Sequence, residues 1–257
     1  MTRAPLAGAL AAFALVAGAC GGGSSSGSST STTAQSRPAA AAPAPDVIST
    51  CAGASPRWRT LDVASLSAAA LGEGRDGVVF LNETGNDSCP WVALAQAIAA
   101  HGARVALFEY RSVDASHEAG AVRDALAVAA AVTKPGGRSA LVGASLGGRV
   151  VFEAAARQPG RIGAIVSLSG ERTVLDYHDI LPAARRVRAP LLYIGSEQDG
   201  LTDGARQPRQ LHRAVRSRVN ESVLVSGSQH GTDLLSGEEG RRLSARIERF
   251  VTTQLGR

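Results

Sequence analysis

The sequence predicts an α/β domain whose mainly parallel sheet is covered by helices on both faces. Several apolar runs have the length of a strand and contain no alternating polar residues, among them residues 78–81, 105–108 and 162–168. Such runs are typical of strands that are buried on both faces. Segments with apolar residues at helical spacing separate them, and strands that alternate with helices form parallel sheets.

The elements are expected in the following order. Residues 57–63 and 67–71 could form an antiparallel pair that opens the sheet. The next helix has Trp91, Leu94 and Ile98 on one face and ends at His101. Leu243, Ile247 and Phe250 lie on one side of the last helix, which covers residues 239–254. The remaining strands are expected at 78–81, 105–108, 139–142, 162–168, 191–194 and 219–225, and the remaining helices at 119–132, 148–157 and 205–216.

The amino terminus has the pattern of an export signal. A basic start, an apolar stretch and small residues precede Cys20, which indicates a signal peptide over residues 1–19. This arrangement resembles a bacterial lipobox, so we expect Cys20 to carry lipid and to anchor the protein to the membrane. Ala17 departs from the strongest lipoboxes, and an ordinary signal peptidase could cut at the same bond. Residues 20–45 have the composition of a flexible tether.

Residues 46–257 remain for one domain, which is long enough to bury a sizeable core. The formal net charge of +5 comes almost wholly from arginine, since Lys134 is the only lysine. Export and the lack of aromatic residues among the arginines exclude a nucleic-acid partner. The arginines are interpreted as a solvated surface that could face anionic lipid head groups.

Two cysteines, Cys51 and Cys89, remain in the domain. An exported compartment permits disulfides, and an even count favours one bridge between them. Two buried free thiols are the alternative.

The sequence Gly143-Ala144-Ser145-Leu146-Gly147 stands between an expected strand and an expected helix. In that context Gly-x-Ser-x-Gly predicts a nucleophile elbow, a sharp turn that exposes the serine hydroxyl. The N–H of Leu146, at the start of the helix, would then donate to a developing oxyanion. The pattern alone is weak, because residues 23–27 of the tether also match it.

Polar residues follow the carboxyl ends of other expected strands. Asp199 follows the strand at 191–194, and His230 follows the strand at 219–225. Ser, Asp and His in this order are typical of an α/β-hydrolase triad. From about residue 57 onward the sequence resembles a compact α/β-hydrolase, with dienelactone hydrolases and esterases as relatives. The resemblance implies Ser145 as nucleophile, His230 as general base and Asp199 as the acid that orients the imidazole.

Glu197 and Asp203 compete with Asp199 for the role of the acid. Asp199 lies where the family's acid loop carries its Asp, whereas Asp203 is better explained as the cap of the next helix. His230 differs from the other histidines because it follows the last strand in a Gly- and Ser-rich turn.

The loop after residues 78–81 departs from the family pattern. The family often has His-Gly at this position, where this sequence has Asn82 and Glu83. The next residue, Thr84, would offer the second oxyanion N–H, since a backbone donor needs no particular side chain. Glu83 could distort this loop or repel an anionic substrate.

Only about twenty residues separate the strands at 162–168 and 191–194, so no large lid domain is expected. An open cleft suits small or polar acyl substrates.

The sequence therefore predicts a cell-envelope serine hydrolase, specifically a carboxylic-ester hydrolase that acts through an acyl-enzyme on a small-molecule ester. No cofactor or metal is expected, and the oligomeric state is left open. A catalytically inactive, surface-tethered binding module on a hydrolase scaffold is the main alternative, and a structural envelope lipoprotein is a third. The intact Ser, Asp and His favour the enzyme, because the fold alone cannot separate these functions.

Overall fold

A computed structural model describes residues 46–52, 57–63, 65–111, 118–174 and 177–256. The expected signal peptide (1–19), the lipidation site Cys20 and most of the tether (20–45) lie outside these residues, and their assignment stays a prediction. In the part of the chain that is described, no helix has both the length and the apolar character needed to cross a membrane.

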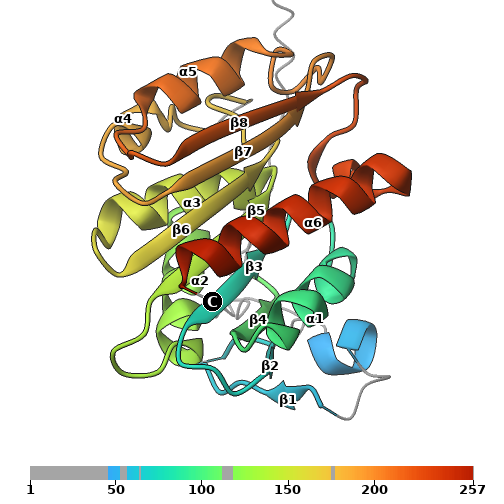
Figure 1. Cartoon of the computed structure of the whole chain (residues 1–257), viewed down its shortest axis with the longest axis vertical. Coiled ribbons are helices and arrows are strands. Elements are labelled where there is room, and N and C mark those ends of the chain that lie inside the picture. The colour runs from blue at the N-terminus through green and yellow to red at the C-terminus, as the bar shows by residue number, and fades with distance from the viewer. Residues whose placement is uncertain (1–45, 53–56, 64, 112–117, 175–176, 257) are drawn as a thin grey trace, which may run out of the picture. The chain divides into compact units, whose positions relative to one another are not determined.

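An eight-stranded sheet forms the centre of the domain (Figure 1). Its spatial order is β1-β2-β4-β3-β5-β6-β7-β8. The first two strands pair antiparallel, β2 pairs antiparallel with β4, and all later pairs are parallel. The strands are β1 (Arg59–Thr60), β2 (Ala68–Leu71), β3 (Gly77–Leu81), β4 (Arg104–Phe108), β5 (Ser139–Ala144), β6 (Ile162–Leu168), β7 (Leu191–Ser196) and β8 (Asn220–Val225).

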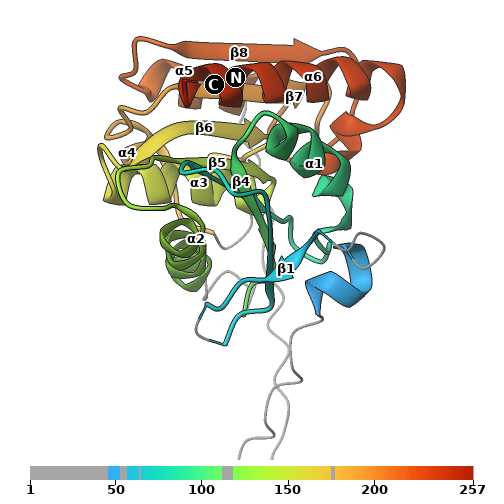
Figure 2. The same ribbon diagram turned by 60° about the horizontal axis from the view of Figure 1, so that its bottom comes forward.

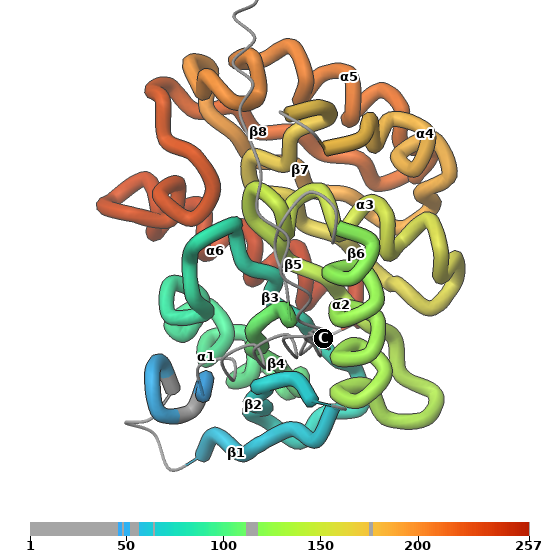
Figure 3. Tube along the Cα trace, turned by 180° about the vertical axis from the view of Figure 1, so that it is seen from behind, coloured from blue at the N-terminus to red at the C-terminus, as the bar shows by residue number. Residues whose placement is uncertain are grey.

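Helices cover the sheet on both faces (Figures 1, 2 and 3). One face packs against α1 (Val92–Ala100) and α6 (Gly237–Gln254). The opposite face packs against α2 (Glu118–Val132), α3 (Leu146–Arg157), α4 (Leu181–Ala184) and α5 (Arg206–Ala214). Every residue of β3, β5, β6 and β7 is buried, as the uninterrupted apolar runs predict for strands covered on both sides.

Each strand and long helix expected from the sequence is present. The predicted opening pair is real but short, and α5 ends at Ala214 because Val215 has an extended backbone, with ψ of 133°. Among the described residues, the sequence pattern missed several short helices, since segments of three to five residues are too short to show a helical period. They are η1 (Ile48–Ala52), η2 (Cys89–Trp91), α4 and η4 (Gly231–Leu235).

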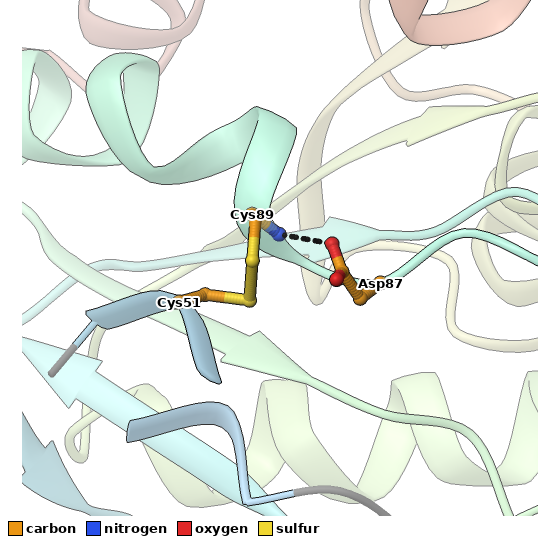
Figure 4. Close-up of side chains that lie close together, drawn as sticks. All are labelled: Cys51, Asp87 and Cys89. Carbon is orange, nitrogen blue, oxygen red and sulfur yellow. Dashed lines mark hydrogen bonds between the residues drawn. A yellow bond between two sulfur atoms is a disulfide. The ribbon is translucent and has the colours of Figure 1, made fainter. Parts of the chain in front are cut away.

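Cys51 and Cys89 form the predicted disulfide, with a Cα–Cα distance of 4.7 Å (Figure 4). It links η1 to η2 and so holds the start of the domain beside α1. The Cys89 N–H donates to Asp87 Oδ1 over 2.9 Å, which places this carboxylate beside the two sulfur atoms. Both sulfurs are engaged in the bridge, so this cluster is explained without a metal ion.

Candidate active site

Ser145 occupies the turn between β5 and α3 with φ of 47° and ψ of −114°. This left-handed backbone is rare for a residue with a side chain and is a form of strain found at functional sites. The turn also requires its two glycines. A Cβ on Gly143 would lie 2.3 Å from the oxygen of Gly147, and a Cβ on Gly147 would lie 2.2 Å from the oxygen of Leu81. The chain thus forms the geometry that the Gly-x-Ser-x-Gly pattern predicts.

The first turn of α3 points its N–H groups toward the same edge of the sheet. Leu146 is the first residue of α3, and the first N–H groups of a helix have no partner within it. The N–H of Gly147 donates over 3.0 Å to the carbonyl of Asn82 in the loop after β3. This bond ties the elbow to the loop that carries Thr84, the other expected oxyanion donor.

His230 and Asp199 are brought together as predicted from the sequence. His230 Nδ1 lies 2.8 Å from Asp199 Oδ2, and the N–H of Leu201 donates to Asp199 Oδ1 over 3.0 Å. His230 immediately precedes η4, and Asp199 lies in the loop after β7. Asp199 is buried, whereas one fifth of the His230 side chain is exposed. The competing Glu197 and Asp203 make neither of these contacts.

Glu171 lies between Ser145 and His230, and no sequence pattern predicted a role for it. The Ser145 hydroxyl donates to Glu171 Oε1 over 3.0 Å, and the same oxygen lies 3.3 Å from His230 Nε2. Glu171 is only 2% exposed, and its second oxygen has no hydrogen-bond partner among the described residues. The one signal that could have found it is its position after the carboxyl end of β6, at the same sheet edge as the other site residues.

Two carboxylates therefore face the two nitrogens of one imidazole. Burial lowers the pKa of His230, but the hydrogen bond with Asp199, the contact with Glu171 and the charges of both carboxylates outweigh it and raise this pKa to about 10. Burial raises the pKa of Asp199, but its hydrogen bond with His230 and the charge of the imidazolium bring it below the ordinary value. At neutral pH this arrangement holds His230 as an imidazolium.

The loop that carries Glu171 is fastened to α3 by Arg149. The buried guanidinium donates to the carbonyls of Glu171 and His178, over 2.8 and 2.7 Å. It also pairs with both oxygens of Glu118, at 3.0 and 3.2 Å, in the two-pronged geometry that suits a guanidinium. The Tyr193 hydroxyl donates to the carbonyl of Gly170 over 3.0 Å. These bonds fix the position of the Glu171 backbone.

Glu83 holds the histidine loop against the loop after β3. The N–H of Thr232 donates to Glu83 Oε1 over 2.7 Å, and the Thr232 hydroxyl donates to the same oxygen. Gly231 has a φ of 57°, and a Cβ there would also lie 2.2 Å from Glu83 Oε2, so glycine is favoured where the two loops meet. Glu83, where this sequence departs from the family pattern, thus supports the position of His230. The sequence pattern did not predict this role.

A cavity of about 300 Å³ opens beside these groups. Ser145, Glu171 and His230 contribute polar atoms, and Leu146, Val174, Tyr177 and Leu201 contribute apolar surface. Thr84 and Glu83 line it as well, which places the expected oxyanion loop at the cavity wall. This size and lining suit a small acyl group with a few polar contacts.

Comparisons with known proteins agree with this architecture. Residues 77–193 match the family described as alpha/beta hydrolase fold. No curated protein sequence matches the chain. The chain has the α/β-hydrolase fold. Its described residues form a mostly parallel sheet of eight strands and include no large lid, and its site groups a serine, a histidine and two acids.

Solved structures resemble it in fold at low sequence identity. A monoacylglycerol lipase from Paleococcus ferrophilus is 16% identical, with a TM-score of 0.61, over 74% of this chain and 99% of that one. A dienelactone hydrolase from Anabaena variabilis is 16% identical, with a TM-score of 0.61, over 77% and 97%. An enol-lactonase from Burkholderia xenovorans is 15% identical, with a TM-score of 0.60, over 74% and 98%.

Proposed function

We propose that the protein is a serine hydrolase that cleaves carboxylic esters with small or polar acyl groups. The observation that supports this most is the strained Ser145 turn beside the His230–Asp199 pair in one cavity. The structural neighbours include proteins described as a lipase, a dienelactone hydrolase and an enol-lactonase. All three names refer to hydrolysis of an ester or a lactone.

In this proposal Ser145 Oγ attacks the acyl carbon of the ester while His230 Nε2 takes the hydroxyl proton. Asp199 stabilises the imidazolium through Nδ1. The N–H groups of Leu146 and Thr84 donate to the oxyanion of the tetrahedral intermediate. His230 then protonates the departing alcohol, and Ser145 is left as an acyl ester.

The second half of the reaction reverses these roles. His230 removes a proton from a water molecule that attacks the acyl carbon, and the same proton returns to Ser145 when the carboxylic acid leaves. Before the first half can proceed, the Ser145 hydroxyl must exchange its present acceptor, Glu171, for His230. The reactive form therefore differs from the resting structure by this rearrangement and by the loss of a proton from His230.

We further propose that the protein works on the extracytoplasmic side of the membrane, anchored through lipid on Cys20. The support is the leader, the cysteine and the tether in the sequence. The Cys51–Cys89 bridge agrees with an oxidising compartment.

Labelling with a fluorophosphonate probe tests the reaction chemistry. An ordinary serine does not react, so labelling reports the base and the oxyanion donors together with the serine. The wild-type domain should label at Ser145, Ser145→Ala and His230→Ala should not label, and Asp199→Asn should label slower by orders of magnitude. A folded wild-type domain that does not label would contradict the proposal. Full-rate labelling of His230→Ala would show that another group is the base.

One observation favours the alternative of an inactive binding module. Glu171 accepts the hydrogen bond that the Ser145 hydroxyl should donate to His230, and it helps to keep the imidazole charged. If Glu171 never leaves this position, the site binds small molecules without cleaving them. The same labelling experiment separates the two functions.

A further inference from the structure

Glu171 is a built part of the site, although the triad reaction does not require it. Its backbone is held by Arg149, and its neighbour Ser169 has a left-handed backbone with φ of 49°. Gly170 between them packs so closely that a Cβ would lie 2.5 Å from the oxygen of Gly148. A carboxylate fixed in this way against the nucleophile needs a function of its own.

The charged groups around the cavity show which kind of partner the Glu171 carboxylate lacks. Arg149 lines the cavity, but its charge is matched by Glu118, and the charge of His230 is shared between Asp199 and Glu171 Oε1. Glu171 remains as an acid with one oxygen that accepts no hydrogen bond among the described residues. A buried carboxylate in this condition favours a positively charged donor.

The distance between Glu171 and Ser145 indicates where a positively charged donor would have to lie. Glu171 Oε1 lies 3.0 Å from Ser145 Oγ, the atom that attacks the acyl carbon. A group bound to Glu171 is therefore attached within a bond or two of the scissile carbonyl. The terminal torsion of a glutamate is broad, so either oxygen can turn toward such a group.

We propose that Glu171 recognises the ammonium group of an α-aminoacyl substrate, so that the enzyme prefers esters of amino acids with a free amine. This inference rests on the proposed serine hydrolase function and names its substrate class. The ammonium replaces the Ser145 hydroxyl and His230 as the partner of Glu171, and Ser145 is then free to donate to His230. Cleavage consumes water and yields the amino acid and the alcohol. When the acyl group is neutral, Glu171 stays in contact with the catalytic residues Ser145 and His230.

Three esters of similar size test the preference on the wild-type protein: L-alanine methyl ester, N-acetyl-L-alanine methyl ester and methyl propionate. Acid release is followed below the pKa of the free amine, where alanine methyl ester is cationic. We expect kcat/KM for alanine methyl ester to exceed that for the two neutral esters by roughly 10–100-fold. Equal kcat/KM values for the three esters would overturn the inference. This comparison uses the wild-type protein alone.

Glu171→Gln keeps the shape of the side chain and removes its charge. We expect this variant to lose the preference, with slower cleavage of alanine methyl ester and faster cleavage of methyl propionate. Glu197→Gln is the matched control, because it removes one exposed carboxylate from the neighbouring acid loop and should keep the preference. A preference that survives in Glu171→Gln would overturn the inference.

Fluorophosphonate labelling separates the two proposals. If Ser145 labels and the esters are cleaved without preference, the serine hydrolase stands and only the role of Glu171 is wrong. If Glu171→Gln is folded but no longer labels, Glu171 is the base of the reaction and the substrate inference is wrong. If the wild-type protein does not label at all, the proposed function itself fails.

Discussion

The loops after β5 and β6 begin alike and then differ. Each starts with a serine in a left-handed backbone, with φ of 47° at Ser145 and 49° at Ser169. After Ser145 the chain enters α3 at once, whereas after Ser169 it passes through an irregular loop that carries Glu171. The first loop places a hydroxyl at the edge of the sheet, and the second places a carboxylate against that hydroxyl.

The two loops satisfy their backbone groups by different means. A helix supplies most hydrogen bonds of the first loop, and its unpartnered N–H groups remain available to a substrate. The second loop depends on distant side chains. Arg149, Tyr193 and Gln207 bond to the backbone of its residues. We therefore expect the second loop to be the more sensitive of the two to substitutions elsewhere in the domain.

The largest expected effect follows from removing the main support of the second loop. Arg149→Met would leave the buried Glu118 with only His178 as a partner and would free the carbonyls of Glu171 and His178. Breaking a buried pair from one side costs about 3–5 kcal/mol of unfolding free energy. Urea unfolding should show this loss.

Arg157→Met is the matched control on the same helix. Its ion pair with Glu153 is 3.7 Å long and the Arg157 side chain is 43% exposed, so the free energy of unfolding should change by less than about 1 kcal/mol. Similar losses in both variants would show that Arg149 does not support the loop as argued.

The sequence predicted the first loop and missed the second for a physical reason. The Ser145 turn needs glycine on both sides, and this steric demand leaves a short pattern that can be read without a structure. The place of Glu171 depends on Arg149, Tyr193 and Gln207, which are 22 to 36 positions away in the sequence and follow no fixed spacing. Glu83 is similar, because its partner Thr232 belongs to the loop after β8.

The sheet was predictable because each buried strand is a continuous apolar run, whatever its neighbours are. Helices α4 and η4 were not, since segments of four and five residues are too short to repeat the helical period. The Cys51–Cys89 bridge needed only an even count and an exported context. What the sequence could not show is that Glu171 and Glu83 also contact the catalytic groups at the carboxyl edge of the sheet, because tertiary packing decides it.

A smaller effect is expected from the disulfide, which lies away from both loops and tests whether global stability and the site are coupled. The bridge closes a segment in which the cysteines are 38 positions apart. Replacing both cysteines with serine should lower the free energy of unfolding by about 2–4 kcal/mol, because the unfolded chain gains freedom. The rate of fluorophosphonate labelling should stay within a few-fold of wild type.

Thermal melting with and without a reductant provides the control. The wild-type domain should melt earlier when reduced, and the double serine variant should show no such shift. A large loss of labelling in the double variant would mean that η2 positions the loop after β3, and that the bridge supports the site directly.

The smallest expected effect is a shift in pH dependence, and it compares the two acids that face His230. Labelling requires a neutral imidazole, so its rate should rise with pH as His230 loses its proton, with a midpoint near the pKa of about 10. Burial lowers the pKa of His230, and the two acids raise it. Asp199 makes the larger hydrogen-bond contribution, and Glu171 follows through its contact with the imidazole and its negative charge. Glu171→Gln should therefore move the midpoint down by about 1–3 pH units, as expected when one nearby opposite charge is removed. At neutral pH the variant should then label faster than wild type, since more of its His230 is neutral.

Asp233→Asn removes an exposed carboxylate from the same histidine loop and should leave the midpoint of the labelling rate in place. A midpoint that does not move in Glu171→Gln would show that Asp199 alone sets the charge of His230, and the second loop would then have no electrostatic effect on the elbow.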